Sequence, residues 1–171
     1  MSFILFWLVT IFPFLRGVVV NDKPVNVVDQ DTLARTLWGE ARGEGYTGMQ
    51  AVANVIMNRY KKAQGSVSVA RRWGGTVAEI CQKPYQFSTW NANDPNLHLV
   101  QAVTTADSNF ATALDIAKRA LQGRLPDLTG GADHYLNIAV TKQIRGGTLP
   151  PWADLNKRTA SIGSHTFLRL A

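Results

Sequence analysis

The chain has 171 residues, which is enough for one domain with its own hydrophobic core. Hydrophobic residues make up 46% and charged residues 18%, which is typical of a globular protein and excludes a disordered one. Cys81 is the only cysteine, so the chain can form neither an internal disulfide nor a structural cysteine–zinc site.

The net charge of +6 comes from 18 Lys and Arg against 12 Asp and Glu. Such an excess favours an anionic partner, namely nucleic acid, a membrane surface or an acidic polymer of the cell envelope. The basic residues are scattered, however, and no helix-turn-helix, zinc-finger or RNA-recognition signature accompanies them. We therefore interpret most of them as a solvated basic surface and predict no nucleic-acid partner.

Residues 3–15 form an apolar run with no charge before Arg16. This run is too short for an ordinary membrane-spanning helix, which needs about twenty residues. It also fits a secretory signal poorly, because no Lys or Arg precedes it and no small-x-small cleavage site follows. Three interpretations remain: an uncleaved export anchor, which we favour, a segment on the membrane surface, or an arm packed on the domain. We assign this segment to residues 1–20, a polar linker to 21–28 and the folded domain to 29–171.

A helix is predicted from Asp29, with Asp29 or Asp31 as its N-cap, because a short carboxylate accepts hydrogen bonds from the free N–H groups of the first turn. Leu33 and Leu37 recur at helical spacing and mark the buried face. Glu40 follows on the same face, three residues after Leu37.

Glu40 is a candidate general acid because of this position. A carboxyl group at the end of an apolar stripe is costly to ionise, so burial there favours the protonated form that a general acid needs. Glu44 would share the face, but Gly43 and Gly45 are expected to end the helix before it.

Two more helices are signalled by capping-box patterns, in which a hydroxyl residue is followed three positions later by Glu or Gln. The first begins at Thr47, with Gln50 as its partner. The second pairs Thr76 with Glu79 before a short helix through Cys81, which gives Glu79 a structural role.

A longer helix is predicted from Phe110 to Leu121, ending at Gly123. Beyond Pro126, pairs of glycines and prolines break the chain, and alternation over residues 164–170 indicates a short strand. We predict an α+β fold that is mainly α, with a helical lobe, a smaller lobe of loops and short strands, and a cleft between them.

Three sets of residues carry a recognisable pattern. Residues 37–59 read Leu-Trp-Gly-Glu-Ala-Arg-Gly-Glu-Gly-Tyr-Thr-Gly-Met-Gln-Ala-Val-Ala-Asn-Val-Ile-Met-Asn-Arg, and residues 83–91 read Lys-Pro-Tyr-Gln-Phe-Ser-Thr-Trp-Asn. Residues 132–135 read Ala-Asp-His-Tyr and residues 162–169 read Ile-Gly-Ser-His-Thr-Phe-Leu-Arg. In sequence and order these resemble the opening, central and closing segments of SleB-type cell-wall hydrolases. The resemblance covers about residues 30–170, and the first block is the most specific.

The resemblance implies a lysozyme-like fold, related to transglycosylases, that acts on N-acetylmuramic acid–N-acetylglucosamine strands. It also implies that the first Glu of the Gly-Glu-Ala-Arg-Gly-Glu motif, here Glu40, is the essential acid/base. One departure is the insertion of residues 145–151 before Trp152, which is longer than the family pattern leads us to expect.

The apolar residues 3–15 lie outside the matched region. On a short chain without a wall-binding module they resemble the uncleaved export anchors of phage endolysins. We therefore expect the protein to lyse a host bacterium from its cell envelope or periplasm, with membrane association through residues 3–15 before release. The expected partner is the glycan strand of peptidoglycan, and we expect a monomer.

Most glycosidases need two carboxylates. The chain has only three Glu, and Glu79 already caps a helix, so Glu44 is the obvious second candidate. Two carboxylates that close on one helix face perturb each other's ionisation instead of flanking a sugar. Lytic transglycosylases need only one, because the C6 hydroxyl of muramic acid attacks its own anomeric carbon and gives a 1,6-anhydro product. We therefore favour this chemistry over a hydrolytic muramidase, and a non-catalytic wall-binding protein is a further alternative.

Candidate substrate-binding residues mix aromatic faces with polar groups, which suits stacking on sugars and hydrogen bonding to them. They are Glu44, Tyr85, Gln86, Trp90, Asn91 and Tyr135. Tyr135 is expected to contact the substrate or Glu40, with a packed core tyrosine as the alternative. Phe87 fits an aromatic core better, and His165 fits a structural role on the terminal strand. The three histidines have no metal-ligand spacing, so we predict no metal and no cofactor.

Overall fold

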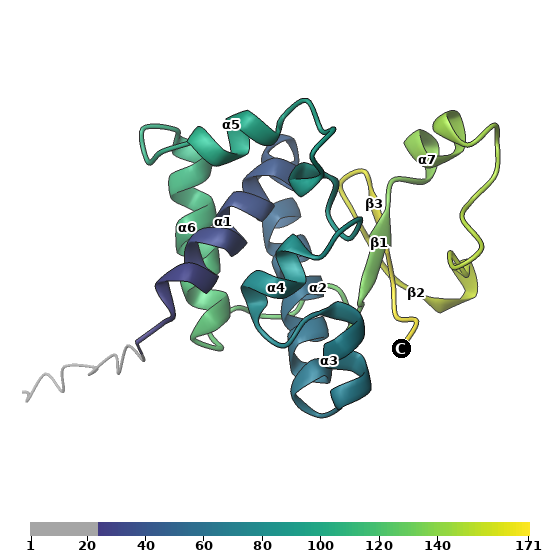
Figure 1. Ribbon diagram of the computed structural model, residues 1–171. Coiled ribbons are helices and arrows are strands. Elements are labelled where there is room, and N and C mark those ends of the chain that lie inside the picture. The colour runs from purple at the N-terminus through teal and green to yellow at the C-terminus, as the bar shows by residue number, and fades with distance from the viewer. Residues whose placement is uncertain (1–23) are drawn as a thin grey trace, which may run out of the picture.

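The computed structural model of the protein describes residues 24–171. This part of the chain has the predicted α+β architecture, with a large helical lobe and a smaller lobe that holds a three-stranded sheet (Figure 1). No helix in the described part is both long and apolar enough to cross a membrane. The predictions for residues 1–20 lie outside the described residues, and the division into segment, linker and domain stays a prediction.

The first helix, α1 (Val27–Ala41), begins two residues earlier than predicted. Its N-cap is Asn26, whose side chain accepts hydrogen bonds from two N–H groups of the first turn. The prediction of Asp29 or Asp31 as the cap is therefore wrong. Asp29 instead accepts a hydrogen bond from the backbone of Ala78 (2.8 Å), and Asp31 forms an ion pair on the surface.

A single 3-10 turn, η1 (Arg42–Glu44), leads directly into α2 (Gly45–Gln64). Because α2 begins at Gly45, the predicted capping box of Thr47 and Gln50 is wrong. Gln50 is buried, and its amide donates to the carbonyl oxygen of Pro126 at 2.9 Å. The direct connection keeps both glutamates of the motif at one corner of the helical lobe.

The helical lobe is completed by five further elements: α3 (Val67–Trp73), α4 (Val77–Gln82), η2 (Ser88–Trp90), α5 (Leu97–Ala102) and α6 (Ser108–Leu121). The capping box of Thr76 and Glu79 is present at the start of α4, which confirms the structural role of Glu79. The predicted helix that ends near Gly123 is α6, and Gly123 has a positive φ of 71° just beyond it.

The core of this lobe lies where α1 packs against α2, α4 and α6. Leu33 and Leu37 from α1, and Met49 and Ile56 from α2, are each at most 1% exposed. The predicted apolar stripe of α1 is thus confirmed. Phe87 is 1% exposed in the same core, as its aromatic-core interpretation required.

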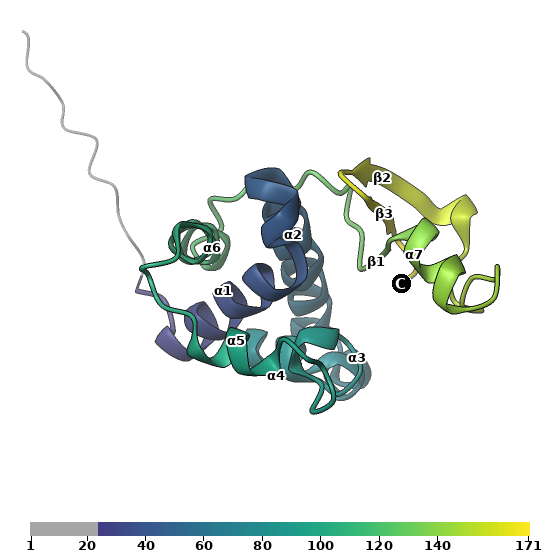
Figure 2. The same cartoon turned by 90° about the horizontal axis from the view of Figure 1, so that it is seen from above.

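The smaller lobe contains β1 (His134–Leu136), α7 (Ile138–Ile144), η3 (Leu155–Lys157), β2 (Arg158–Ile162) and β3 (His165–Leu168). The strands are antiparallel in the order β1-β3-β2, so the predicted terminal strand, β3, is central. Phe167 on β3 packs with Ala51 and Val55 of α2 in a second buried cluster. Seen from above, the sheet lies on the side of α2 opposite to α6 (Figure 2).

A buried carboxylate, Asp133, fastens the end of the chain to α2. It accepts hydrogen bonds from Lys62, from the ring of His134 (2.7 Å), and from the backbone of Leu170 and Ala171 (2.9 Å each). Burial alone would raise the pKa of this carboxyl, but these hydrogen bonds outweigh burial and hold its pKa well below the usual range.

The first prediction concerns this carboxylate. Because its pKa is lowered in the folded state, its contribution to stability is present above the pKa of the unfolded chain, about 3.9, and is lost as the pH falls. We expect Asp133→Asn to lower the free energy of unfolding by about 3 kcal/mol at pH 7, since it removes the buried carboxylate that pairs with the charge of Lys62.

Urea unfolding should show that the difference in the free energy of unfolding between wild type and variant narrows from pH 4 to pH 2. Asp115→Asn is the matched control, because that side chain is 60% exposed in a surface pair with Arg119. A gap that stays constant down to pH 2 would contradict the prediction.

Candidate active site

Glu40 is the penultimate residue of α1, and its half-buried carboxylate joins the two lobes. Oε1 accepts hydrogen bonds from the backbone N–H of Thr89 (3.1 Å) and the hydroxyl of Ser88 (3.4 Å) in η2. Oε2 accepts one from the hydroxyl of Tyr135 in β1 (2.9 Å). The carboxylate of Glu40 is therefore surrounded by more hydrogen-bond donors than its place on the apolar stripe predicted, because the side chain extends past the end of the core toward η2.

Gly39 is required by the close approach of η2. A Cβ atom at this position would lie 2.1 Å from the hydroxyl oxygen of Thr89, far inside van der Waals contact. The missing side chain thus allows the backbone of Thr89 to reach Glu40.

Trp90 anchors η2 to α1 from the other end. Its indole N–H donates to the hydroxyl of Thr36 at 2.9 Å, and Thr36 itself donates to the carbonyl oxygen of Thr32. The polar atom of Trp90 is therefore used within the protein, and only its partly buried ring is free to meet a ligand.

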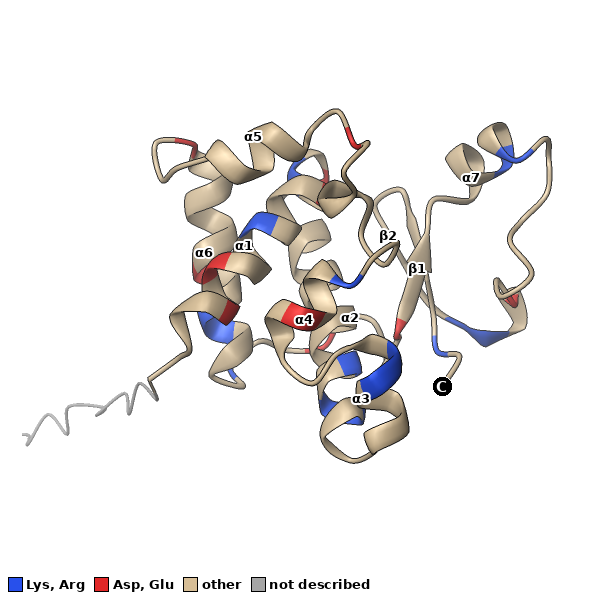
Figure 3. Cartoon of the chain, in the orientation of Figure 1, with Lys and Arg blue, Asp and Glu red and all other residues tan. Residues whose placement is uncertain are grey.

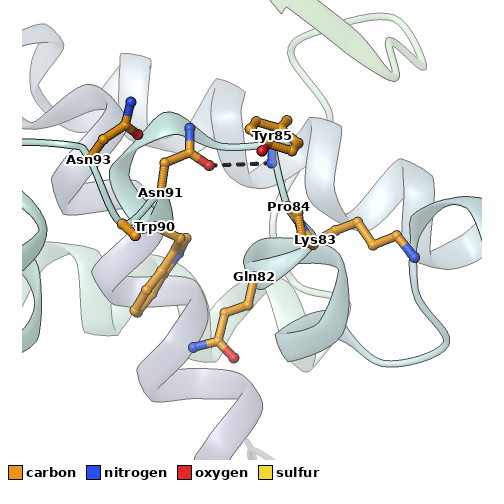
Figure 4. A pocket seen from close by; sticks show the side chains of 8 residues that line it. Gln82, Lys83, Pro84, Tyr85, Trp90, Asn91 and Asn93 are labelled. Carbon is orange, nitrogen blue, oxygen red and sulfur yellow. Dashed lines mark hydrogen bonds between the residues drawn. The ribbon is translucent and has the colours of Figure 1, made fainter.

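A cavity of about 400 Å³ opens beside η2, lined by residues 82–85 and 90–93 (Figure 4). Tyr85 on its wall is 89% exposed and has a φ of 64°, in the left-handed region that residues other than glycine rarely adopt. The side-chain oxygen of Asn91 accepts a hydrogen bond from the backbone N–H of Tyr85 (3.3 Å), which fixes this turn. Tyr85, Trp90 and Asn91, three of the predicted substrate-binding residues, thus line one cavity.

Gln86 is not among the residues that line this cavity. Its side-chain oxygen accepts a hydrogen bond (3.0 Å) from Arg59, which is 4% exposed and also donates to the carbonyl oxygen of Asp133 at 2.6 Å. Gln86 therefore has a structural partner, and its substrate-binding role stays a prediction. The sequence does not single out Arg59, because nothing local distinguishes it from the other arginines.

Tyr135 is positioned by aromatic rings on three sides. Its ring lies 6.5 Å from that of Phe87, 5.8 Å from that of Phe167 and 5.0 Å, edge-on, from that of His165. Burial, together with the neighbouring charge of Glu40, raises the pKa of Tyr135 well above its usual value, so its hydroxyl keeps its proton and donates. The expected contact between Tyr135 and Glu40 is present.

His165 lies beside Tyr135 in the candidate site, a position that its predicted structural role on the strand did not require. Burial lowers its pKa, although the nearby charges of Glu44 and Glu40 oppose the shift. The imidazole is therefore favoured in its neutral form beside Tyr135.

Glu44 is engaged away from Glu40. Its Oε1 accepts a hydrogen bond from the hydroxyl of Ser164 (2.6 Å), and its Oε2 accepts one from the Ser164 backbone N–H (3.0 Å). These hydrogen bonds lower the pKa of Glu44, so it is ionised at neutral pH. The structure thus gives Glu44 a protein partner where sequence analysis expected a substrate contact.

Residues 43–168 match the sequence pattern of the family described as Cell Wall Hydrolase. The chain belongs to the cell wall hydrolase family. This match begins three residues after Glu40, so the role of Glu40 rests on the geometry and on the motif.

Two solved structures resemble this cell wall hydrolase. One is the catalytic domain of the germination-specific lytic transglycosylase SleB from Bacillus anthracis, with 27% identity and a TM-score of 0.57 over 84% of this chain and 96% of that one. The other is the catalytic domain of SleB from Bacillus cereus, with 26% identity and a TM-score of 0.56 over 90% and 100%. Among curated proteins, none matches the chain.

Among the described residues, Lys and Arg lie on both lobes, including α3 and α7 (Figure 3). Within residues 24–171, no group of His, Cys, Asp and Glu is arranged to hold a metal ion. The described site presents one carboxyl group, that of Glu40, held by neutral donors.

The second prediction tests the packing at Gly39. We expect Gly39→Ala to displace η2 and weaken the hydrogen bond from Thr89 to Glu40. Amide hydrogen exchange at Thr89 should accelerate at least about tenfold, which corresponds to 1.4 kcal/mol.

Gly43→Ala is the matched control, because a Cβ there meets nothing within 4 Å and should leave this exchange rate unchanged. An unaltered exchange rate of the Thr89 amide in Gly39→Ala would show that the close approach of Gly39 and Thr89 does not determine the position of η2.

Proposed function

We propose that this cell wall hydrolase degrades peptidoglycan as a lytic transglycosylase, with Glu40 as both acid and base. The observation that carries the proposal is the unequal state of the two motif glutamates. Both carboxylates accept hydrogen bonds from neutral donors, but those of Glu44 all come from Ser164 and lower its pKa, so that Glu44 holds no proton to give at neutral pH. Those of Glu40 come from η2 and from Tyr135 in the other lobe. The reaction should therefore be one that needs a single carboxyl group.

In the proposed reaction, Glu40 gives its proton to the glycosidic oxygen as the bond from C1 of N-acetylmuramic acid to N-acetylglucosamine breaks. The C6 hydroxyl of the same muramic acid then forms a bond to C1 and returns its proton to Glu40. The result is a 1,6-anhydro end without added water. Thr89, Ser88 and Tyr135 stabilise the carboxylate that exists between the two proton transfers.

The solved relatives support this choice, since one of them is described as a germination-specific lytic transglycosylase. We assign the cavity of Tyr85, Trp90 and Asn91 to binding of the glycan strand, because exposed aromatic faces stack on sugar rings. For the biological role we propose host-cell lysis from the envelope, motivated by the apolar run at residues 3–15.

The third prediction is that Glu40→Gln abolishes release of soluble fragments from purified walls, because an amide cannot supply the proton. Glu79→Gln is the matched control, since glutamine also completes the capping box of α4. Both variants should unfold at the temperature of the wild type. Full activity in Glu40→Gln would refute the assignment.

Mass spectrometry of the wild-type products decides between the reaction types. Muramic ends that are lighter by one water than hydrolysed ends support the transglycosylase. Hydrolysed ends would indicate a muramidase, and binding to walls without any soluble product would indicate a wall-binding protein.

The fourth prediction concerns Tyr85. Replacement by Ala or by Gly removes the ring, so each variant should raise KM for glycan chains by roughly three- to tenfold, or about 0.5–1.5 kcal/mol. Tyr85→Gly should nevertheless be about 1 kcal/mol more stable than Tyr85→Ala, because only glycine tolerates the left-handed φ without strain.

Tyr46→Ala serves as a control, because this exposed tyrosine accepts its hydrogen bond from Arg119 on α6. Unchanged KM in both Tyr85 variants would remove Tyr85 from the glycan site.

A further inference from the structure

The carboxylate of Glu44 lies in a niche that two glycines leave open. A Cβ at Gly48 would lie 2.2 Å from the Cβ of Glu44, and a Cβ at Gly163 would lie 1.9 Å from its Oε2. Gly163 also has a φ of 55°, which places the next residue, Ser164, against the carboxylate. Any side chain at position 48 or 163 would therefore collide with Glu44.

The two hydrogen bonds to Ser164 cross from one lobe to the other. Glu44 closes η1 in the helical lobe, whereas Gly163 and Ser164 form the turn between β2 and β3. A charged acceptor with two donors from a single residue is a strong and directional contact. It therefore fixes the start of β3 relative to the end of α1.

The start of β3 in turn fixes Tyr135. His165 follows Ser164 directly, and its ring contacts Tyr135 edge-on at 5.0 Å. Phe167, two residues further, is the register partner of Tyr135 in the sheet. A displaced turn would move both contacts, and with them the hydroxyl that donates to Glu40.

We propose that Glu44 is a positioning residue: it holds the β2–β3 turn so that Tyr135 meets Glu40, and it touches neither the substrate nor the reacting atoms. This inference rests on the proposed function of Glu40. It also assigns Ser164, which the sequence did not single out, as the partner through which Glu44 acts.

A double-mutant cycle on kcat and KM for soluble peptidoglycan chains tests the inference. Glu44→Gln removes the charge and one acceptor oxygen, Ser164→Ala removes the donor hydroxyl, and the double variant removes both, so each weakens the same contact. We expect each to lower kcat by roughly ten- to a hundredfold, with KM changed less than twofold. The effect of the double variant should be smaller than the product of the two single effects, because both residues act through this one contact.

Ser164→Thr provides the conservative rescue. It keeps the hydroxyl and the backbone N–H, and position 164 is exposed, so we expect it to retain most of the wild-type kcat. Gly163→Ala should lower kcat as Glu44→Gln does, since its Cβ would displace the carboxylate. These two variants keep the test decisive even where Glu44→Gln folds poorly.

Three results would overturn the inference. Glu44→Gln as inactive as Glu40→Gln, beside a fully active Ser164→Ala, would make Glu44 a second catalytic carboxylate. A rise in KM alone would indicate that Glu44 binds the substrate. A wild-type kcat in Ser164→Ala would show that the β2–β3 turn does not position Tyr135. A wild-type protein that releases no fragments at all would instead refute the proposed function.

Discussion

The candidate site depends on the hydrogen bonds of the buried Arg59 guanidinium. It donates to the carbonyl oxygen of Asp133, just before β1, and to the side chain of Gln86, just before η2. These are the two segments that supply hydrogen-bond donors to Glu40 from opposite lobes. Loss of Arg59 would leave two acceptors without their charged donor, and each such bond contributes about 1.5–3 kcal/mol. The geometry around Glu40 is thus set by a residue that does not touch it.

Close backbone approach is the second constraint, and it explains why the opening motif contains both glycine and glutamate. Gly39 lets η2 reach Glu40, whereas Gly48 leaves space for the side chain of Glu44. Each carboxylate therefore has a glycine that accommodates it or its partner. The two glutamates look alike in the sequence, but Glu40 accepts hydrogen bonds from both lobes, whereas Glu44 accepts them from the β2–β3 turn alone.

The sequence predicts what is local. The apolar stripe of α1 and the capping box of Glu79 follow from spacings of three and four residues, and both are present. The wrong predictions concern side chains whose partners lie far along the chain. Gln50 binds a carbonyl 76 residues away, and Asp29 binds a backbone N–H 49 residues away. The hydrogen bonds of Glu44 are equally distant in sequence, since they come from a serine 120 residues away. No periodicity encodes such pairs, so Glu40 could be singled out from its motif, whereas Arg59 and Ser164 could not.

The hydrogen bond from Tyr135 to Glu40 also couples protonation to mechanics. A hydrogen bond to an ionised carboxylate is roughly twice as strong as one to a neutral acid. This hydrogen bond between β1 and α1 is therefore weaker while Glu40 carries its proton and stronger once the proton has been given up. In the proposed reaction, the two lobes are thus held together most firmly between the two proton transfers and less firmly when the proton returns.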